Sequence, residues 1–355
     1  MVVVGADVHK RTHTFVAVDE VGRKLGEKVV VATTAGHRKA LRWAGKQFGA
    51  ELLWGIEDCR PLSARLERDL LSAGQKVVRV APKLMAQSRA SARTRGKSDP
   101  IDALAVARAV LREPDLPVAS HDPVSRELKL LVDRREDLVA QRTSTINRLR
   151  MRIHELDPAH APALGSLHRA NPRRVLADWL TTQPGLLAEL ARDELSDIDR
   201  LTHAIDALAA RIGDKITPAA PTLLTLHGCG DLTAAKLVGE TAGVARFKSE
   251  PAFARHAGVA PIPVWSGNTA GRVRMTRSGN RQLNAALHRI AITQIRLKGS
   301  AGHTYYRKRI DAGDSPKEAL RCLKRRLARI VFSRLRVDNH PDHAFHTSAT
   351  TCPLT

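Results

Sequence analysis

The sequence predicts an α/β domain at the N-terminus, followed by regions that are mainly α-helical. Residues 1 to about 112 alternate short apolar runs, rich in valine, with segments of helical periodicity, as an α/β domain requires. From residue 123 onward, long stretches carry apolar residues at heptad spacing. With 355 residues the chain is long enough for two or three domains, each with its own core.

Three consecutive strand-like segments come first, at residues 2–6, 14–18 and 28–32, with a turn at 21–23. A helix over 37–48, a strand over 52–56, a helix over 62–73 that ends at Gly74, and a strand over 77–80 follow. Three meandering strands and then alternation are the order of a ribonuclease-H-like domain. We therefore predict this fold for residues 1–120.

Four acidic residues stand where such a fold can gather them. Asp7 follows the apolar run 2–6, and Glu57 follows the run 52–56. Asp99 and Asp102 lie three residues apart at the predicted start of a helix, with Pro100 in its first turn, and they share one face. Taken alone, this pair is better explained by Asp99 as an N-cap and Asp102 as a first-turn acid facing the helix dipole.

The two strand-end acids favour a shared site over simple capping. Hard Mg²⁺ ions prefer oxygen ligands, and two such ions can clamp the attacking and leaving oxygens of a phosphodiester. The expected topology brings all four carboxylates to one edge of the sheet. The sequence therefore predicts a site for two Mg²⁺ ions formed by four acids: Asp7, Glu57, Asp99 and Asp102.

The balance of charge predicts a polyanionic partner. Lysine and arginine number 58 against 36 acids, which gives a formal net charge of +22 and an isoelectric point near 10.7. Nucleic acid is the first candidate, with an anionic membrane surface as the alternative. The chain has no uncharged apolar run of spanning length and no signal-peptide pattern at its N-terminus, so we expect a soluble, cytoplasmic protein without a membrane partner. Because aromatic residues make up only 3%, phosphate contacts should outweigh base stacking.

Residues 121–217 are predicted to form a coiled-coil helical hairpin. Val132, Val139, Ile146 and Ile153 recur every seven residues, and a second heptad stretch carries apolar residues at 198, 205 and 212. Arg135 and Arg142 interrupt one seam. They indicate either a basic stripe or a plain bundle helix with snorkelling arginines. The proline-rich segment 157–184 would be the tip of the hairpin.

A C-terminal domain is predicted over residues 218–337, ahead of a disordered tail at 338–355. Segment 223–237 resembles a helix-hairpin-helix, in which Gly228 and Gly230 let backbone N–H groups approach a phosphate and Lys236 adds charge. The alternative is a helix-loop-helix whose glycines are only a C-cap and a turn. The four cysteines have neither metal-ligand nor disulfide spacing: Cys59, Cys229, Cys322 and Cys352.

Residues 261–268 are predicted to be a loop because of their Pro and Gly content, and this loop contains Ser266. Basic residues cluster in two places after it. One group surrounds a turn at 278–280: Arg272, Arg274, Arg277 and Arg281. The other lies in a helical stretch predicted over 305–336: Arg321, Lys324, Arg325, Arg326 and Arg329. Both groups are candidate nucleic-acid contacts.

Four motifs resemble those of the insertion-sequence-110 family of transposases, which are bacterial mobile-element recombinases. The motifs are residues 5–10, 55–57, 97–103, and 258–261 leading to Ser266-Gly267. The resemblance covers almost the whole chain apart from the tail. It implies a RuvC-like Asp-Glu-Asp-Asp domain, a C-terminal transposase domain with Ser266 as nucleophile, and a metal site that assists the serine.

The same resemblance implies the partners. A structured guide (bridge) RNA would pair with double-stranded target and donor DNA. A dimer would assemble into a tetrameric synapse, in which the carboxylates of one chain and the serine of another form a composite site. The implied place of action is the bacterial cytoplasm, in association with the nucleoid.

Other functions remain open on the sequence. A RuvC-like junction nuclease would use water in place of Ser266. An inactive, nucleic-acid-binding copy would use the acids only as helix caps. A tyrosine recombinase would use Tyr305 or Tyr306, but the supporting Arg/His pattern is not legible. Zinc is not expected, because His340, His343 and His346 lie in the tail, and His9 and His13 straddle a turn-like stretch.

Overall fold

The computed structural model describes residues 1–57, 60–81, 84–85, 88, 98–114, 116–120, 122–264, 272–275 and 279–339; for residues 60, 61, 264 and 272–275 it describes the backbone alone. The chain divides into two compact units. The first combines residues 1–123 with the segment from 241 to the C-terminus, and the second is Val124–Glu240. Among the described helices, none is long and apolar enough to cross a membrane.

The N-terminal sheet has five strands in the order β3-β2-β1-β4-β5. The strands are β1 (Val2–Val8), β2 (Thr12–Val18), β3 (Lys24–Val31), β4 (Leu52–Glu57) and β5 (Lys76–Val80). β2 pairs antiparallel with β1 and β3, whereas β1 pairs parallel with β4, and β4 with β5. A meander that leads into parallel strands is the predicted ribonuclease-H-like order, and the structure confirms it.

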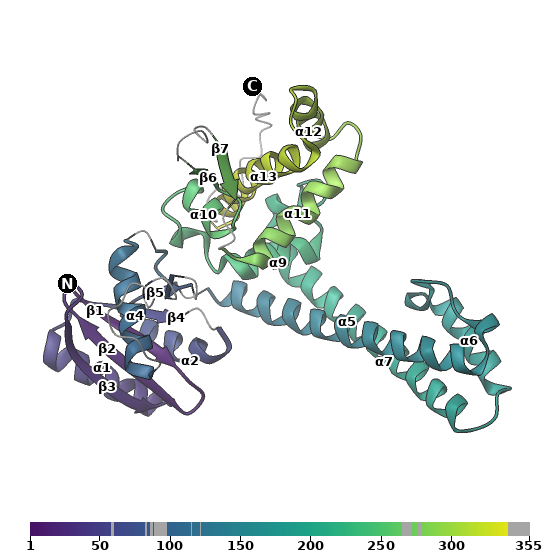
Figure 1. Ribbon diagram of the computed structural model, residues 1–355, viewed down its shortest axis with the longest axis horizontal. Coiled ribbons are helices and arrows are strands. Elements are labelled where there is room, and N and C mark those ends of the chain that lie inside the picture. The colour runs from purple at the N-terminus through teal and green to yellow at the C-terminus, as the bar shows by residue number, and fades with distance from the viewer. Residues whose placement is uncertain are drawn as a thin grey trace. The chain divides into compact units, whose positions relative to one another are not determined.

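Helices cover both faces of this sheet (Figure 1). α1 (Thr34–Phe48) and α2 (Arg60–Ser72) lie on the face that carries Phe15 and Trp54, and α4 (Asp99–Arg112) lies on the face that carries Val3 and Val16. Side chains alternate between the faces of a strand, so even-numbered residues of β1 point toward α1 and odd-numbered ones toward α4. Asp7 is therefore on the α4 face.

The second unit is built on two 34-residue helices, α5 (Pro123–Leu156) and α7 (Leu186–Ala219). Leu149 packs with Ile198, and Leu138 packs with Ile205, so the two helices run antiparallel. Polar pairs follow the same order, because Arg142 donates to Thr202 Oγ1 (3.1 Å) and Arg148 pairs with Glu194 (3.3 Å). The heptad residues thus form a helical hairpin, while its description as a coiled coil stays a prediction.

The segment between these helices is more structured than the predicted proline-rich tip. It holds two 3₁₀ turns, Pro158–His160 and Ser166–His168, and a helix, α6 (Ala170–Thr181). α6 packs Leu176 and Leu180 into the hairpin core, and its buried Arg173 pairs with Asp199 of α7 (2.5 Å). The proline content concealed this helix, since Pro172 lies in the first turn, where proline is tolerated.

α8 (Pro221–Leu224) and α9 (Asp231–Thr241) follow α7. The remaining elements of the first unit are a 3₁₀ turn at Val244–Arg246, α10 (Glu250–His256), β6 (Pro261–Val264), β7 (Arg272–Met275), α11 (Arg281–Arg296), α12 (Ala301–Asp311) and α13 (Pro316–Asp338). Most of the predicted loop over 261–268 lies outside the described residues, but 261–264 form a strand. Pro261 and Pro263 fit there because alternate residues of a two-stranded ribbon direct the backbone nitrogen outward, where no hydrogen bond is lost.

The basic helical stretch predicted over 305–336 consists of two helices, α12 and α13. Ser315 caps α13 in a capping box with Glu318, and Pro316 occupies the first turn. The box is legible in the sequence as Ser-Pro-Lys-Glu, directly after Gly313 and Asp314. α12 therefore ends at Asp311 and α13 begins a new direction.

Candidate active site

Asp7 and Glu57 lie side by side at the carboxyl ends of two parallel strands. The register pairs Ala6 of β1 with Ile56 of β4, so the next residues along each strand are neighbours. Both acids share the strand parity of Gly5 and Gly55, whose missing Cβ atoms face α4. The two predicted strand-end acids therefore occupy the α4 face of the sheet.

Glycine brings α4 close enough to add its own acids. A Cβ on Gly5 would lie 2.2 Å from the carbonyl oxygen of Ala103, and a Cβ on Gly55 would lie 2.6 Å from Val110 Cγ2. Each glycine stands two residues before an acid on the same strand face. The bare backbone lets the helix lie directly on the sheet, with its first turn beside the strand ends.

The first turn of α4 carries Asp99 and Asp102, as predicted from the sequence. The capping explanation for Asp99 is wrong, because Ser98 holds the N-cap position and its side chain makes no capping hydrogen bond. Asp102 is 9% exposed, whereas the Asp99 side chain is 54% exposed. The helix start therefore presents one acid inward and one toward solvent.

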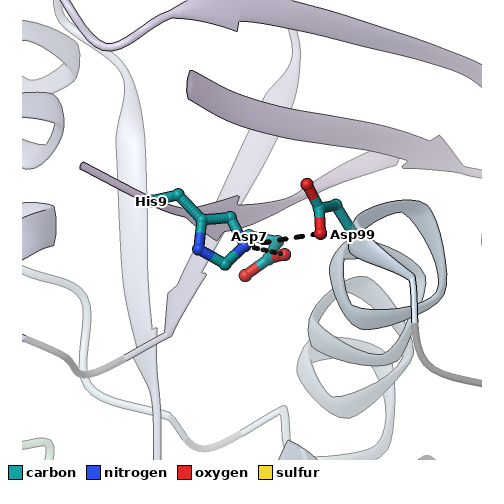
Figure 2. Close-up of side chains that lie close together, drawn as sticks. All are labelled: Asp7, His9 and Asp99. Carbon is teal, nitrogen blue, oxygen red and sulfur yellow. Dashed lines mark hydrogen bonds and ion pairs between the residues drawn. The ribbon is translucent and has the colours of Figure 1, made fainter. Parts of the chain in front are cut away.

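Asp7, His9 and Asp99 form a cluster whose ligand atoms all lie within 4.8 Å of one another (Figure 2). His9 Nε2 is 3.0 Å from Asp7 Oδ2 and 3.5 Å from Asp99 Oδ1. Asp7 is only 4% exposed. Burial raises the pKa of Asp7, and the neighbouring Asp102 and Asp99 raise it further, while His9 opposes them.

These donors fit a divalent cation. A buried carboxylate beside two others is disfavoured in its charged form unless positive charge neutralises it. Carboxylate oxygens are the ligands that hard cations prefer. A group of at least three His, Cys, Asp or Glu ligand atoms close together can hold a metal ion. Within the described part of the chain, one group meets this condition, and it consists of Asp7, His9 and Asp99.

His9 was not predicted as a member of this site, although its position in the sequence gives a signal. His9 directly follows β1, two residues after Asp7, and alternate residues of an extended segment point to the same face. An acid on that face therefore predicts that the histidine two positions later lies beside it. His13 has a different place, since it is buried on the opposite face and stacks on His37 with ring centroids 5.1 Å apart.

The residues predicted around the serine are only partly described. Ser266 and Arg277 lie outside the described residues, and Arg272 and Arg274 are seen as backbone in β7. Arg281 begins α11 and is exposed.

The base of the β6–β7 hairpin is held by two asparagines. Asn280 N–H donates to His256 O (2.6 Å), and Asn284 Nδ2 donates to the carbonyls of Ala257 (3.2 Å) and Gly258 (3.0 Å). Lys324 of α13 donates to Asn284 Oδ1. Burial lowers the pKa of Lys324, and the nearby Arg321 lowers it further. Lys324 therefore acts inside the fold.

Two further basic residues of α13 have partners within the protein. Arg325 makes a bidentate ion pair with Glu250 at the start of α10. The Arg326 guanidinium lies 4.7 Å from the centre of the Tyr305 ring. Arg321 and Arg329 are exposed on the same helix. Of the five predicted contacts on α13, these two are the most accessible to a nucleic-acid phosphate.

The segment around Gly228 is a turn between α8 and α9. Gly228 has φ of +85°, which requires glycine, whereas a Cβ on Gly230 would meet open space. Lys236 is 5% exposed and pairs with Glu136 of α5. We therefore leave Lys236 out of the proposed nucleic-acid surface, and the helix-hairpin-helix stays a prediction. Neither Cys229 nor Cys322, the two cysteines among the described residues, forms a disulfide.

Comparison with known proteins gives concordant matches over both ends of the chain. A transposase model of the IS110 family matches residues 4–158, and a model described as "Transposase IS116/IS110/IS902 family" matches residues 220–307. The insertion element IS900 uncharacterized 42 kDa protein of Mycobacterium paratuberculosis is 27% identical, covering 98% of this chain and 97% of that protein. The insertion element IS116 uncharacterized 44.8 kDa protein of Streptomyces clavuligerus is 26% identical, covering 94% of each.

A solved structure, T. thermophilus RuvC in complex with Holliday junction substrate, is 17% identical and covers 32% of this chain and 94% of its own. Its TM-score is 0.27.

Proposed function

Because this chain belongs to the IS110 family of transposases, enzymes that cleave and rejoin DNA, we propose that it exchanges DNA strands at a bacterial insertion sequence through a metal-dependent carboxylate site and a covalent serine intermediate. One observation carries the proposal. Asp7, Asp99 and Asp102 come together across more than ninety residues of sequence, at the strand end that Glu57 also occupies. An N-cap role for Asp99 does not explain this convergence, since Ser98 is the N-cap, and a first-turn interaction of Asp102 with the helix dipole does not require the Asp7 carboxylate beside it.

In the proposed site, four residues hold divalent cations, for which Mg²⁺ with two ions per site is our expectation: Asp7, Glu57, Asp99 and Asp102. Bound Mg²⁺ would supply Lewis-acid stabilisation of negative charge on the phosphate oxygens. The carboxylates would fix the positions of the cations. Asp7 is the least exposed member of the set, so surrounding residues hold its side chain in place.

Ser266 is the proposed nucleophile. Its Oγ attacks the phosphorus and loses its proton, the P–Oγ bond forms, and the P–O bond to the leaving strand breaks as that oxygen gains a proton. The resulting phosphodiester resembles the bond that was broken, so rejoining needs no external energy source. Arg272 or Arg274 of the hairpin would add charge stabilisation near the serine.

The proposed partners are double-stranded target and donor DNA together with a structured guide (bridge) RNA. The net charge of +22 favours binding to the phosphates of these nucleic acids. Arg321 and Arg329 are exposed on one helix and are available for such contacts. We further propose that a dimer assembles into a tetrameric synapse, where the serine of one chain meets the carboxylates of another. Catalysis would then depend on assembly, and it would take place in the bacterial cytoplasm at the nucleoid.

The test is denaturing electrophoresis of reactions with labelled DNA, guide RNA and Mg²⁺, followed by mass spectrometry of any protein–DNA adduct. Wild-type protein should give an adduct that maps to Ser266, and Ser266→Ala should give neither adduct nor cleavage. Cleavage by Ser266→Ala would show that water is the nucleophile and that the protein is a junction nuclease. An adduct at Tyr305 or Tyr306 would refute the serine mechanism. Binding without any cleavage by the wild type would indicate a non-catalytic copy.

A further inference from the structure

We propose that His9 is a direct ligand of the divalent cation at the carboxylate site, and that its imidazole makes the site bind Mn²⁺ more tightly than Mg²⁺, the cation expected for the four carboxylates alone. This inference rests on the proposed metal-dependent function. It goes beyond the four acids, because it adds a nitrogen donor and predicts which cation the site selects.

The distances around His9 match those of ligands on a shared ion. An octahedral cation with ligands at about 2.1 Å places adjacent ligand atoms about 3.0 Å apart and opposite ones about 4.2 Å apart. His9 Nε2 lies 3.0 Å from Asp7 Oδ2 and 3.5 Å from Asp99 Oδ1, and the whole set spans at most 4.8 Å. Shifts of a few tenths of an ångström would bring all three atoms onto one ion.

The direction of approach also suits a ligand. The Asp7 side chain is 6% exposed and forms the floor of the cluster, whereas the side chains of His9 and Asp99 are 51% and 54% exposed. The imidazole stands at the end of β1 and Asp99 at the start of α4, so the two reach the floor from different elements (Figure 2). A cation among them would keep an open side for water or a phosphate.

The chemistry of the donors decides the preference. Mg²⁺ is bound by oxygen ligands and dehydrates reluctantly. Carboxylate-rich sites suit Mg²⁺, Ca²⁺ and Mn²⁺, and of these three only Mn²⁺ is a first-row transition metal, the class that an imidazole nitrogen favours over a hard cation. A site with Asp7, His9 and Asp99 should therefore bind Mn²⁺ more tightly than Mg²⁺. A hydrogen bond from His9 to Asp7 explains the 3.0 Å distance too, but it predicts no bond from nitrogen to a metal.

The experiment is pulsed electron paramagnetic resonance of the full-length protein loaded with Mn²⁺, combined with competition by Mg²⁺. The wild type should show coupling between the bound Mn²⁺ and a ¹⁴N nucleus. His9→Ala should lose this coupling, and its affinity ratio for Mn²⁺ over Mg²⁺ should fall at least about tenfold. His154→Ala is the matched control, since His154 is an exposed histidine of α5, and it should keep both properties.

Three outcomes separate this inference from the proposed function. Loss of the ¹⁴N coupling in His9→Ala supports the ligand. Mn²⁺ that binds in an Asp7-dependent way without ¹⁴N coupling overturns the role of His9 and leaves the carboxylate site intact. Mn²⁺ binding that Asp7→Asn does not alter overturns the proposed metal site itself, and the role of His9 with it.

Discussion

The carboxylate site and the β6–β7 hairpin are held in place by different kinds of contact. At the carboxylate site, α4 lies directly on the sheet, because Gly5 faces the backbone of Ala103 and Ala107 and Gly55 leaves room for the side chains of Val106 and Val110. The hairpin instead has exposed residues at 261–263, and hydrogen bonds from Asn280 and Asn284 fasten its base. The comparison teaches that the first region should be sensitive to added volume and the second to lost polar partners.

The largest expected effect is loss of activity from the carboxylate site without loss of fold. Asp7→Asn should lower strand exchange by more than about a hundredfold, because a cation ligand is removed. The melting temperature should stay constant or rise, since burial raises the pKa of Asp7 and disfavours its charged form. Asp19→Asn in the β2–β3 turn is the control and should keep its activity. A collapsed melting temperature in Asp7→Asn would contradict the separation of site from scaffold.

Added volume under α4 should be almost as damaging. Gly5→Ala places a Cβ 2.2 Å from Ala103 O, so we expect a loss of about 3 kcal/mol or more in the free energy of unfolding. Gly45→Ala on the exposed side of α1 is the matched control. Its Cβ meets nothing within 4 Å, and it should stabilise the protein by about 0.5–1 kcal/mol. Equal effects in urea denaturation would refute the packing argument.

The buried His13 should give the N-terminal domain a pH-dependent stability. Burial lowers its pKa from 6.5 to about 4, and His37 contributes to the shift. The unfolded state therefore binds more protons between pH 4 and 6.5, so stability is complete above pH 6.5 and falls by on the order of 3 kcal/mol as the pH drops to 4. Urea denaturation at several pH values should show a shallower dependence for His13→Leu. An unchanged dependence would mean that His13 does not titrate in this window.

Loss of a polar partner at the hairpin base should weaken catalysis more than folding. Asn284→Ala removes the donors to Ala257 and Gly258, so we expect about tenfold less serine–DNA adduct, a loss of about 1–2 kcal/mol in stability, and unchanged DNA binding. Lys317→Met is the control, because Lys317 is an exposed cation of α13. If Asn284→Ala makes adduct at the wild-type rate, the hairpin does not depend on its base.

The smallest effect concerns nucleic-acid affinity. Arg321→Ala with Arg329→Ala should reduce the slope of log affinity against log salt by roughly one to two units, since each exposed arginine neutralises about one phosphate. Arg325→Ala should leave the slope nearly unchanged and lower stability, because Arg325 is paired with Glu250. A reversed outcome in titrations across salt concentrations would place Arg325 at the nucleic acid.

Much of the N-terminal fold was predictable because its signals are local. The first two predicted strands match the observed bounds to within two residues, β3 begins four residues before its predicted start, and the first turn of α4 is marked by Pro100. Two elements, α6 and β6, were not predicted, because their sequences contain prolines, which usually mark loops. Prolines concealed α6 and β6, although each proline sits where its missing N–H costs nothing.

The sequence by itself determined the order of the N-terminal strands and the placement of Asp7 and Glu57 near strand ends. The spacing of apolar residues and the turn-forming residues that end a strand are both patterns among neighbouring residues, so they can be read locally. Only the tertiary structure decided which charges are available. Lys236 meets Glu136 one hundred residues away, and Arg325 meets Glu250 at a separation of 75. His9 likewise reaches Asp99 only because α4 folds onto β1. Partners so distant in sequence leave no local pattern, so charge and spacing alone cannot tell a ligand from a buried ion pair.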